Sequence, residues 1–476
     1  MKVVFCASEV YPFAKTGGLA DVCGSLPLAL EKNGVDVEIF MPLYRCVDRN
    51  KHQVKQINDG LWRSTIGKNI TVHFIANSFL YDRAGLYGEG HGDYGDNLDR
   101  FQFLCSQTLQ MLRQAPQPPD IIHCHDWHTA LIPAYVRERF REDTFFQNTK
   151  TVLTIHNLAF QGAYPAGDFN KIGLPRHLFN NQIFEFYGKL NLLKAGIHYA
   201  DRVTTVSEQY AREIQTREFG YNMDGVLRHY QQKLEGIING LDYDIWNPET
   251  DSLISRTFDP ATFGEGKAAN KKFLQERCGL PVQPGTPLVG FVSRLAHQKG
   301  VDLILDAMGD LLWDDIQWVF QGVGDIGFQN RLNGLGWHNR HKMSSQVNFD
   351  ESLAHAIYAG ADFLIMPSRY EPCGLSQMIA FRYGTVPVVF RTGGLADTVI
   401  PYDDPQGRGN GFMFTHYHRQ ALVDCVRTAA YVFKDKPRFE HIGRNALAVR
   451  LTWEQSAARY QKIYDTLCTS SQSPVI

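Results

Sequence analysis

Short apolar runs rich in Val and Ile alternate with longer amphipathic stretches from one end of the chain to the other. At the start, residues 2–8 are predicted to form a strand, residues 19–32 a helix that ends at Gly34 in the left-handed conformation, and residues 35–41 the next strand. Repeated strand–helix–strand units predict an α/β fold with parallel sheets covered by helices on both faces. The same alternation predicts later strands at 121–125, 151–156, 203–207, 287–293, 317–322, 362–367 and 386–390.

The alternation is interrupted between residues 241 and 266 by a polar stretch that contains Asn247-Pro248-Glu249 and Pro260. A length of 476 residues allows two or three domains of roughly 100–200 residues each. We therefore predict two doubly wound domains, residues 1–245 and 246–450. A helix predicted at 453–467 comes too late for the second sheet, so the segment 451–476 is expected to cross back to the first domain.

The chain is close to electrically neutral, with 48 Lys and Arg, 50 Asp and Glu, and a formal net charge of −2. Nucleic acid or an anionic membrane surface would demand a basic excess, so neither is expected as a partner. The first apolar run, Val3 to Ala7, is shorter than the ~7–15 residues of a signal-peptide core, and no run approaches the ~20 residues of a membrane span. We expect a cytoplasmic protein, or a plastid stromal one if a transit peptide has been removed.

The nine cysteines are odd in number and include no C-x-x-C pair. Cys6, Cys105, Cys124 and Cys425 lie in apolar runs, so they are expected to be core residues in a reducing compartment. No disulfide framework is predicted.

A cation followed by Thr-Gly-Gly-Leu-Ala-Asp occurs twice, at residues 15–21 and 391–397. Each copy follows a predicted strand and is expected to open a helix. Glycines at Gly17 and Gly18 would let a phosphate approach the backbone, the helix N–H groups would point at it, and Lys15 would add charge. A duplicated turn in which Gly supplies backbone freedom is the alternative. The motif is not G-x-G-x-x-G, so no dinucleotide or other cofactor is predicted.

Two cations, Arg294 and Lys299, lie in the loop that follows the strand at 287–293. They suit a diphosphate whose charge grows as it leaves, although a solvated basic loop is the alternative.

The loop 368–376 follows the strand at 362–367. Pro372 is expected at an early helix position, which would leave the N–H groups near Gly374 and Leu375 as free donors. Glu371 would then lie beside an anion site and meet sugar hydroxyls, or else it caps the helix.

Histidines gather after two predicted strands of the first domain. His156 ends one strand and is either structural or catalytic. In His123-Cys124-His125-Asp126-Trp127-His128 a metal site is the alternative to an active-site wall, but neighbours on a strand face opposite ways and zinc needs three or four converging ligands. Asp242-Tyr243-Asp244 is either a metal-holding D-x-D or a structural turn, and the turn is favoured. No metal site is predicted.

Taken together, these motifs resemble those of the bacterial glycogen synthase and plant starch synthase family, in order and through nearly the whole chain. The resemblance implies the GT-B fold, in which two doubly wound, Rossmann-like domains face each other across a deep cleft. The segments that carry it are Lys15 to Asp21, His125 to His128, Thr154 to Asn157, Asn239-Gly240, Ser293-Arg294, Gln298 to Gly300, Pro367 to Arg369, Glu371 to Leu375 and Thr392 to Asp397.

The resemblance implies metal-free transfer of glucose from ADP-glucose to the non-reducing end of an α-1,4-glucan, with retention of configuration. Departure and attack would occur on one face of the sugar, and the leaving phosphate would take the acceptor's proton. By carry-over, the catalytic residues are Glu371, His156, Arg294 and Lys299. The substrate-binding residues are Lys15, Gly17, Gly18, Asp21, Asn239, Cys373, Gly374, Leu375 and Ser376 for the donor, Phe349 for its adenine, and Asp126, Trp127 and Tyr94 for the acceptor.

Other functions remain open at this point. A phosphorylase would need a lysine Schiff base to pyridoxal phosphate, for which no motif is found. A glucan-binding scaffold without activity would not need Lys15, Arg294, Lys299 and Glu371, all of which are present. Trehalose- or sucrose-related transferases fit the paired Thr-Gly-Gly-Leu-Ala-Asp less well. Many relatives carry a second Glu eight residues after the first, where this chain has Ile379, so ribose recognition is unassigned.

Overall fold

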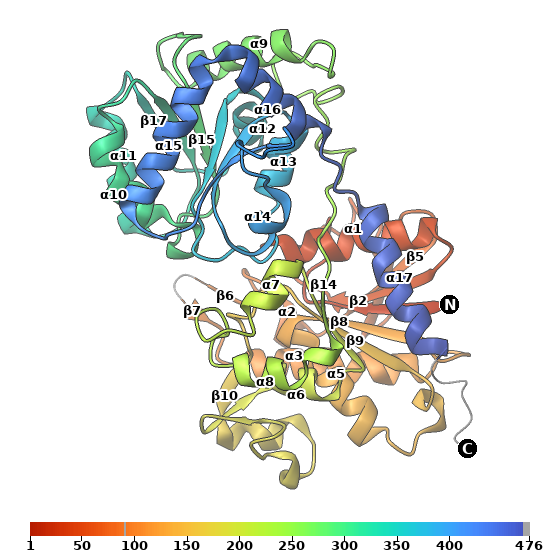
Figure 1. Cartoon of the computed structure of the whole chain (residues 1–476). Helices are drawn as coiled ribbons and strands as arrows, with labels where there is room; N and C mark the ends of the chain where they lie inside the picture. Colours follow the sequence, from red (N-terminus) through yellow and green to blue (C-terminus); the bar gives the residue numbers. More distant parts are fainter. Residues whose placement is uncertain (90–91, 470–476) are drawn as a thin grey trace. The chain divides into compact units, whose positions relative to one another are not determined.

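The computed structural model describes residues 1–89 and 92–469 (Figure 1). The chain divides into two compact units. One unit combines Met1–Gly240 with the segment that begins at Trp453, and the other is the continuous stretch Leu241–Thr452. Each unit has its own hydrophobic core.

The main sheet of the first unit has the strand order β14-β13-β9-β8-β1-β2-β5-β4-β3. From β14 to β5 neighbouring strands are parallel, whereas β4 pairs antiparallel with both β5 and β3. The bounds are β1 Lys2–Cys6, β2 Asp36–Pro42, β3 Lys55–Asn58, β4 Leu61–Ile66, β5 Ile70–Ile75, β8 Ile121–His125, β9 Lys150–Ile155, β13 Arg202–Thr205 and β14 Leu234–Gly236, and the short strands outside it are β6 Gly88–Glu89, β7 Gly92–Asp93, β10 Ala163–Pro165, β11 Glu185–Phe186 and β12 Lys189–Asn191.

Helices cover both faces of this sheet (Figure 1). On one face α17 packs against α1, and on the other α5 contacts both α3 and α6. Gly34, with φ +81°, ends α1 in the left-handed conformation as predicted. The helices are α1 Gly18–Lys32, α2 Ser78–Tyr81, α3 Asn97–Leu112, α4 Asp126–Thr129, α5 Leu131–Ala134, η1 Tyr135–Arg139, η2 Thr144–Phe146, η3 Ala166–Ile172, η4 Arg176–Leu178, α6 Leu192–Tyr199, α7 Glu208–Glu213, α8 Asp224–His229, η5 Gln231–Lys233 and α17 Trp453–Thr469.

The sheet of the second unit is parallel throughout, in the order β17-β16-β15-β18-β19-β20. Numbered along the chain this order is 3-2-1-4-5-6, the arrangement of dinucleotide-binding doubly wound folds. Its elements are α9 Phe263–Arg277, β15 Leu288–Val292, η6 His297–Lys299, α10 Val301–Leu311, β16 Gln317–Gln321, α11 Ile326–His338, β17 Met343–Gln346, α12 Glu351–Gly360, β18 Phe363–Met366, α13 Ser376–Arg382, β19 Val386–Phe390, α14 Gly393–Thr398, β20 Phe412–Phe414, α15 Arg419–Lys434 and α16 Lys436–Ala448.

The strand order reverses at one point in each main sheet: between β1 and β8 in the first unit, and between β15 and β18 in the second. Ligands of open parallel sheets bind at the carboxyl ends of the strands beside such a reversal. The loops that follow these strands are therefore where each unit's chemistry is expected.

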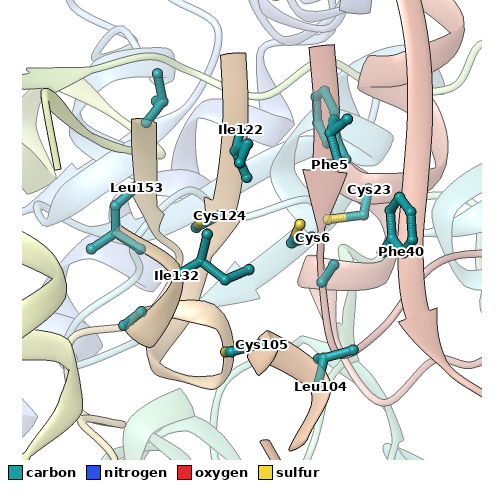
Figure 2. Close-up of a cluster of buried hydrophobic side chains, with 14 of the residues drawn as sticks. Phe5, Cys6, Cys23, Phe40, Leu104, Cys105, Ile122, Cys124, Ile132 and Leu153 are labelled. Atoms are coloured by element: carbon teal, nitrogen blue, oxygen red, sulfur yellow. The ribbon is translucent and has the colours of Figure 1, made fainter. Parts of the chain in front are cut away.

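The core of the first unit is built on β1 and β8, whose side chains are closed in by α1 and α3 (Figure 2). Buried Cys6, Cys23, Cys105 and Cys124 belong to it, and burial raises the pKa of each thiol. The prediction of core cysteines is confirmed for Cys6, Cys105 and Cys124, while Cys425 is only half-buried against the core of the second unit.

Candidate active site

Glu9, in the loop between β1 and α1, is a buried carboxylate that fixes the end of this loop by hydrogen bonds. Its oxygens accept hydrogen bonds from the Thr16 hydroxyl (2.6 Å), the Thr16 and Gly17 N–H groups, and the Tyr87 hydroxyl (2.6 Å). Glu9 therefore satisfies the two amides that precede the first turn of α1. Sequence reasoning missed this residue.

The predicted residues of this loop lie together at the start of α1. Lys15 forms an ion pair with Asp21, with 2.6 Å between Nζ and Oδ1. Gly17 precedes the first helical residue, Gly18, and has φ −157°, a conformation that any residue adopts. A Cβ placed on Gly17 would meet nothing within 4 Å. Neither the backbone nor the packing requires a glycine here, so the open space over the loop is available to a ligand.

The ends of β8 and β9 are joined by Asp126 and the histidines beside it. Asp126 has φ +55° and accepts a hydrogen bond of 2.7 Å from the His156 N–H. His125 Nδ1 and His156 Nε2 lie 3.0 Å apart. Burial raises the pKa of Asp126 to about 7 and lowers the pKa of His156 to about 3. His156 is therefore a neutral imidazole near pH 7, able to hydrogen-bond a hydroxyl but not to act as a cationic acid.

Trp127 lies directly after Asp126 and is closely packed. Its ring stacks on His128 with a centroid distance of 4.1 Å. A Cβ on Gly162 would lie 2.5 Å from the Trp127 ring, so only glycine fits there. Trp127 and Tyr94 line the same hollow of the first unit. The two aromatic residues predicted to face the acceptor are thus brought to one place.

The histidine run before Trp127 is explained by packing. His123 shares a hydrogen bond of 2.8 Å with the Tyr464 hydroxyl and one of 2.6 Å with the Thr154 hydroxyl. Across residues 1–89 and 92–469, no three His, Cys, Asp or Glu side chains converge as metal ligands. In the D-x-D segment, the Asp242 carboxylate accepts from the Asp244 N–H at 2.9 Å, which is the hydrogen bond of a turn.

The second unit places a cation and a carboxylate side by side at its strand-order reversal. Lys299 Nζ lies 2.6 Å from Glu371 Oε2, and the Ser368 hydroxyl donates to the same oxygen at 2.9 Å. Glu371 is buried and Lys299 half-buried, whereas Arg294 is exposed and donates to Gln298 Oε1 at 3.3 Å. Lys299 and Glu371 follow β15 and β18, respectively.

The prediction that Pro372 occupies an early helix position is wrong. Helix α13 begins only at Ser376, with Leu375 as its N-cap residue. Gly374, with φ +75°, separates the proline from the helix because its left-handed backbone cannot continue a helical turn. Buried Cys373 and the N–H groups of Gly374 and Leu375 therefore belong to a loop that runs into the helix.

The second Thr-Gly-Gly-Leu-Ala-Asp segment supports this loop through close backbone contact. The Gly394 N–H donates to the Glu371 carbonyl at 3.0 Å. A Cβ on Gly393 would lie 2.0 Å from that carbonyl oxygen, and one on Gly394 would lie 1.9 Å from the Cys373 carbonyl oxygen. The two copies of the motif each open a helix, as predicted, but only the second is packed so tightly.

Two further predicted residues differ in environment. Asn239 is buried near the end of the first unit, and its Oδ1 has no hydrogen-bond partner among the residues that the structure describes. Phe349, in the second unit, is 86% exposed, so its ring is open for stacking.

Two Rossmann-type sheets with polar loops at their reversal points have the architecture of GT-B glycosyltransferases. Family models agree: residues 2–229 match the starch synthase catalytic domain and residues 275–448 match glycosyl transferases group 1. Within that class the chain belongs to the glycogen synthase and starch synthase family, and it is a glycosyltransferase of glycogen or starch synthesis.

The relatives extend over the whole chain. The glycogen synthase of Geotalea daltonii is 44% identical, and that of Thermotoga maritima is 42% identical; each match covers 98% of both chains. Among solved structures, the catalytic domain of starch synthase IV from Arabidopsis thaliana, bound to ADP and acarbose, is 33% identical with a TM-score of 0.89, covering 98% of this chain and 99% of that one. The resemblance seen in the sequence and the GT-B fold class are confirmed.

A bilayer-spanning helix is not found in the described part of the chain, since none of its helices is both long and apolar enough.

Proposed function

We propose that the chain transfers glucose from ADP-glucose to the non-reducing end of an α-1,4-glucan, with retention of configuration and without a metal ion. The observation that carries this proposal is the Lys299–Glu371 pair at the reversal point of the second sheet, 2.6 Å apart. The pair offers a cation for a diphosphate and a carboxylate for sugar hydroxyls within one small region. The relative of known structure that binds ADP supports the choice of nucleotide.

The donor's diphosphate is assigned to the cations Lys15, Arg294 and Lys299. Negative charge grows on the leaving ADP as the glycosidic bond breaks, and fixed cations stabilise that charge without reorganising. In the first unit, Gly17, which has open space above it, and Gly18 are also assigned to the diphosphate, and in the second unit the N–H groups of Gly374 and Leu375 are assigned to it. Asp21, Asn239, Cys373 and Ser376 line the rest of the donor site, and the exposed Phe349 ring stacks on the adenine.

The reacting glucose is assigned to Glu371 and His156. Glu371 is already bonded to Lys299 and Ser368, which makes it a weak nucleophile but a well-fixed acceptor for sugar hydroxyls. Neutral His156 hydrogen-bonds a hydroxyl near the reacting carbon. The bond from the anomeric carbon to the phosphate oxygen breaks, the acceptor oxygen bonds to that carbon on the same face, and the acceptor's proton passes to the departing phosphate. Asp126, Trp127 and Tyr94 hold the acceptor sugar.

The test is transfer of labelled glucose to glycogen from ADP-glucose and, separately, from UDP-glucose, with EDTA present. Wild type should incorporate label from ADP-glucose, and Glu371→Ala should lose nearly all of it. Glu440→Ala, which changes a half-exposed carboxylate on α16, is the matched control and should behave as wild type. NMR of the new linkage should show the α anomer.

Each part of the proposal has its own contrary result. Preference for UDP-glucose overturns the donor, loss of transfer in EDTA overturns the metal-free reaction, and a β linkage overturns retention. A folded protein that binds glucan but transfers from neither donor would instead be a scaffold.

A further inference from the structure

A hollow of about 540 Å³ in the first unit has seven aromatic side chains among its fifteen lining residues. Tyr94 and Trp127 form its inner part, and Trp127 adjoins Asp126, which is bonded to His156. The outer part is formed by Phe160, Tyr164, Tyr187 and Tyr221, from segments that include β10 and the turn before α8 (Figure 1). The hollow is therefore shared by the assigned acceptor residues and these further aromatic side chains, and all its lining residues belong to the first unit.

Three of the four outer aromatic residues are exposed, and Tyr164 is half-buried. Tyr187 is 77% exposed, Phe160 56% and Tyr221 36%. Side-chain amides of Gln161 and Asn222 stand between them. The lining also contains one carboxylate, Asp93, and one cation, Lys189, so it carries no excess of either charge. Rings that stack, combined with amides and balanced charge, suit a neutral polyhydroxylated chain whose sugar faces are apolar and whose edges carry hydroxyls.

The backbone at these tyrosines is strained. Tyr187 has φ +51° and Tyr221 has φ +47°, a left-handed conformation in which a bulky residue is rare. Tyr187 and Gly188 (φ +74°) join β11 to β12 in a tight hairpin, where Asn-Gly or Asp-Gly is the preferred pair. Three of the described residues with positive φ other than glycine line the hollow, and a fourth precedes Trp127; the whole set is Gln53, Asp126, Tyr187, Tyr221 and Asn222.

Hydrogen bonds hold the two strained turns in place. The Gln161 amide donates to the Tyr221 carbonyl at 3.0 Å, and its oxygen accepts from Asn191, at the end of β12, at 2.7 Å. The Gly188 N–H donates to the Glu185 carboxylate at 2.7 Å. Strain that is maintained by dedicated bonds is characteristic of ligand-binding positions.

We propose that this hollow binds the α-glucan acceptor beyond the sugar units at the reaction centre, with Tyr187 and Tyr221 as stacking platforms that make the enzyme favour longer chains. This inference rests on the proposed acceptor and on the assignment of Trp127 to it. The occupied sugars are remote from the breaking bond, so the platforms act on acceptor affinity and leave the chemical step unchanged.

The test compares Tyr187→Asn, Tyr221→Asn and the double variant with wild type. Asn adopts the left-handed conformation readily, so each variant removes the ring without removing the turn. With saturating ADP-glucose, KM and kcat are measured for maltose, maltoheptaose and glycogen. Each single variant should raise the KM for maltoheptaose by roughly fivefold, the scale of one aromatic stacking contact, while kcat and the values for maltose stay unchanged.

Two controls define the role of the rings. Tyr431→Ala, on α15 of the second unit, removes a tyrosine that is 76% exposed and should change nothing. Tyr187→Phe keeps the ring and should restore the affinity for maltoheptaose.

The opposing results are distinct. Wild-type KM values for every chain length in the double variant would overturn the inference, as would equal losses for maltose and maltoheptaose. If wild type transferred glucose to no acceptor, the proposed function would fail; maltoheptaose binding measured by calorimetry would still decide whether Tyr187 and Tyr221 hold a glucan.

Discussion

At the scale of single residues, Glu9 shows how the loop between β1 and α1, which is proposed to bind the sugar nucleotide, is held in one conformation. Replacing it by Gln keeps one acceptor oxygen but turns an NH₂ group toward the Thr16 and Gly17 N–H donors. A buried donor left unpaired costs about 1–3 kcal/mol. We expect Glu9→Gln to unfold at a lower temperature and to raise the KM for the sugar nucleotide more than it lowers kcat.

Thermal unfolding, and titration of the protein with the sugar nucleotide, check this expectation. Tyr87→Phe removes a hydroxyl that donates to Glu9 and shares a hydrogen bond of 2.8 Å with the Ser8 hydroxyl, but it leaves the Thr16 and Gly17 amides paired. It is the graded control and should cause a smaller change of both. Wild-type stability together with wild-type donor affinity in Glu9→Gln would show that the carboxylate does not position the loop.

The duplicated motif provides a matched pair of glycine variants. Gly17→Ala places a methyl group in open space, so stability should change by less than about 1 kcal/mol while donor affinity falls, because the methyl occupies the room assigned to the diphosphate. At the equivalent position of the second copy, Gly393→Ala places the methyl 2.0 Å from the Glu371 carbonyl oxygen at a residue with φ +43°, so it should lose several kcal/mol of stability. Denaturant unfolding of both variants, with nucleotide titration of Gly17→Ala, measures the contrast; equal stability losses would contradict it.

The sequence identified most of these residues by their place after a strand, but it did not reveal their partners. Glu9 is seven residues from Thr16 and 78 from Tyr87, and no local pattern records the second contact. Pro372 was misplaced for a related reason: proline suits a helix start, and only the left-handed backbone of Gly374 separates it from α13. The assignments of substrate roles to these residues remain predictions.

At the scale of elements, a hydrogen bond connects α17 to the sheet: His123 on β8 shares it with the hydroxyl of Tyr464 on α17. Burial, with a smaller contribution from the charge of His156, lowers the pKa of His123 to about 3, against an ordinary value near 6.5. Because the pKa of His123 is lower in the folded protein than in the unfolded chain, the unfolded chain takes up the proton first as the pH falls. The free energy of unfolding is therefore highest above pH 6.5 and decreases as the pH falls toward 3.

We therefore expect His123→Gln to flatten the acid dependence of stability. Its free energy of unfolding should fall less steeply than that of wild type between pH 6.5 and 3, by up to about 1.4 kcal/mol per pH unit. Urea unfolding of both proteins across that range measures the difference between their free energies of unfolding at each pH. Contributions from the other buried groups are common to both proteins and cancel in this difference. Parallel curves would mean that His123 takes up its proton equally in both states.

Regular elements were predictable where the apolar pattern was strong. The strands at 121–125 and 386–390 have the predicted bounds, and the other predicted strands differ by one or two residues at one or both ends. The antiparallel addition β3–β4 was not predicted because Lys55–Asn58 is exposed along its whole length and shows no alternation. The hairpin at Tyr187 was also missed, since its strands are too short for a period and Tyr-Gly is not a usual turn pair.

At the scale of the whole molecule, the second unit is a continuous segment whose two ends lie together. The Leu241 N–H donates to the Leu451 carbonyl at 2.9 Å, and Leu241 forms a parallel bridge with Thr452. In the first unit, the Ser456 hydroxyl on α17 donates to the Ile238 carbonyl at 2.7 Å, so the points where the chain leaves and re-enters that unit are also close. With a core of its own in each unit, neither should need the other in order to fold.

We predict that residues 241–452 fold as an isolated fragment, and that the first unit folds when a flexible linker of roughly six residues joins Gly240 to Trp453. Far-UV circular dichroism and a cooperative thermal transition measure folding. Neither fragment should transfer glucose, because Lys299 and Glu371 belong to one and Asp126 and His156 to the other. A fragment 241–452 without a cooperative transition would show that its core depends on the first unit. Transfer of glucose by either fragment alone would show that the residues of one unit are sufficient for the reaction, contrary to the proposed assignment.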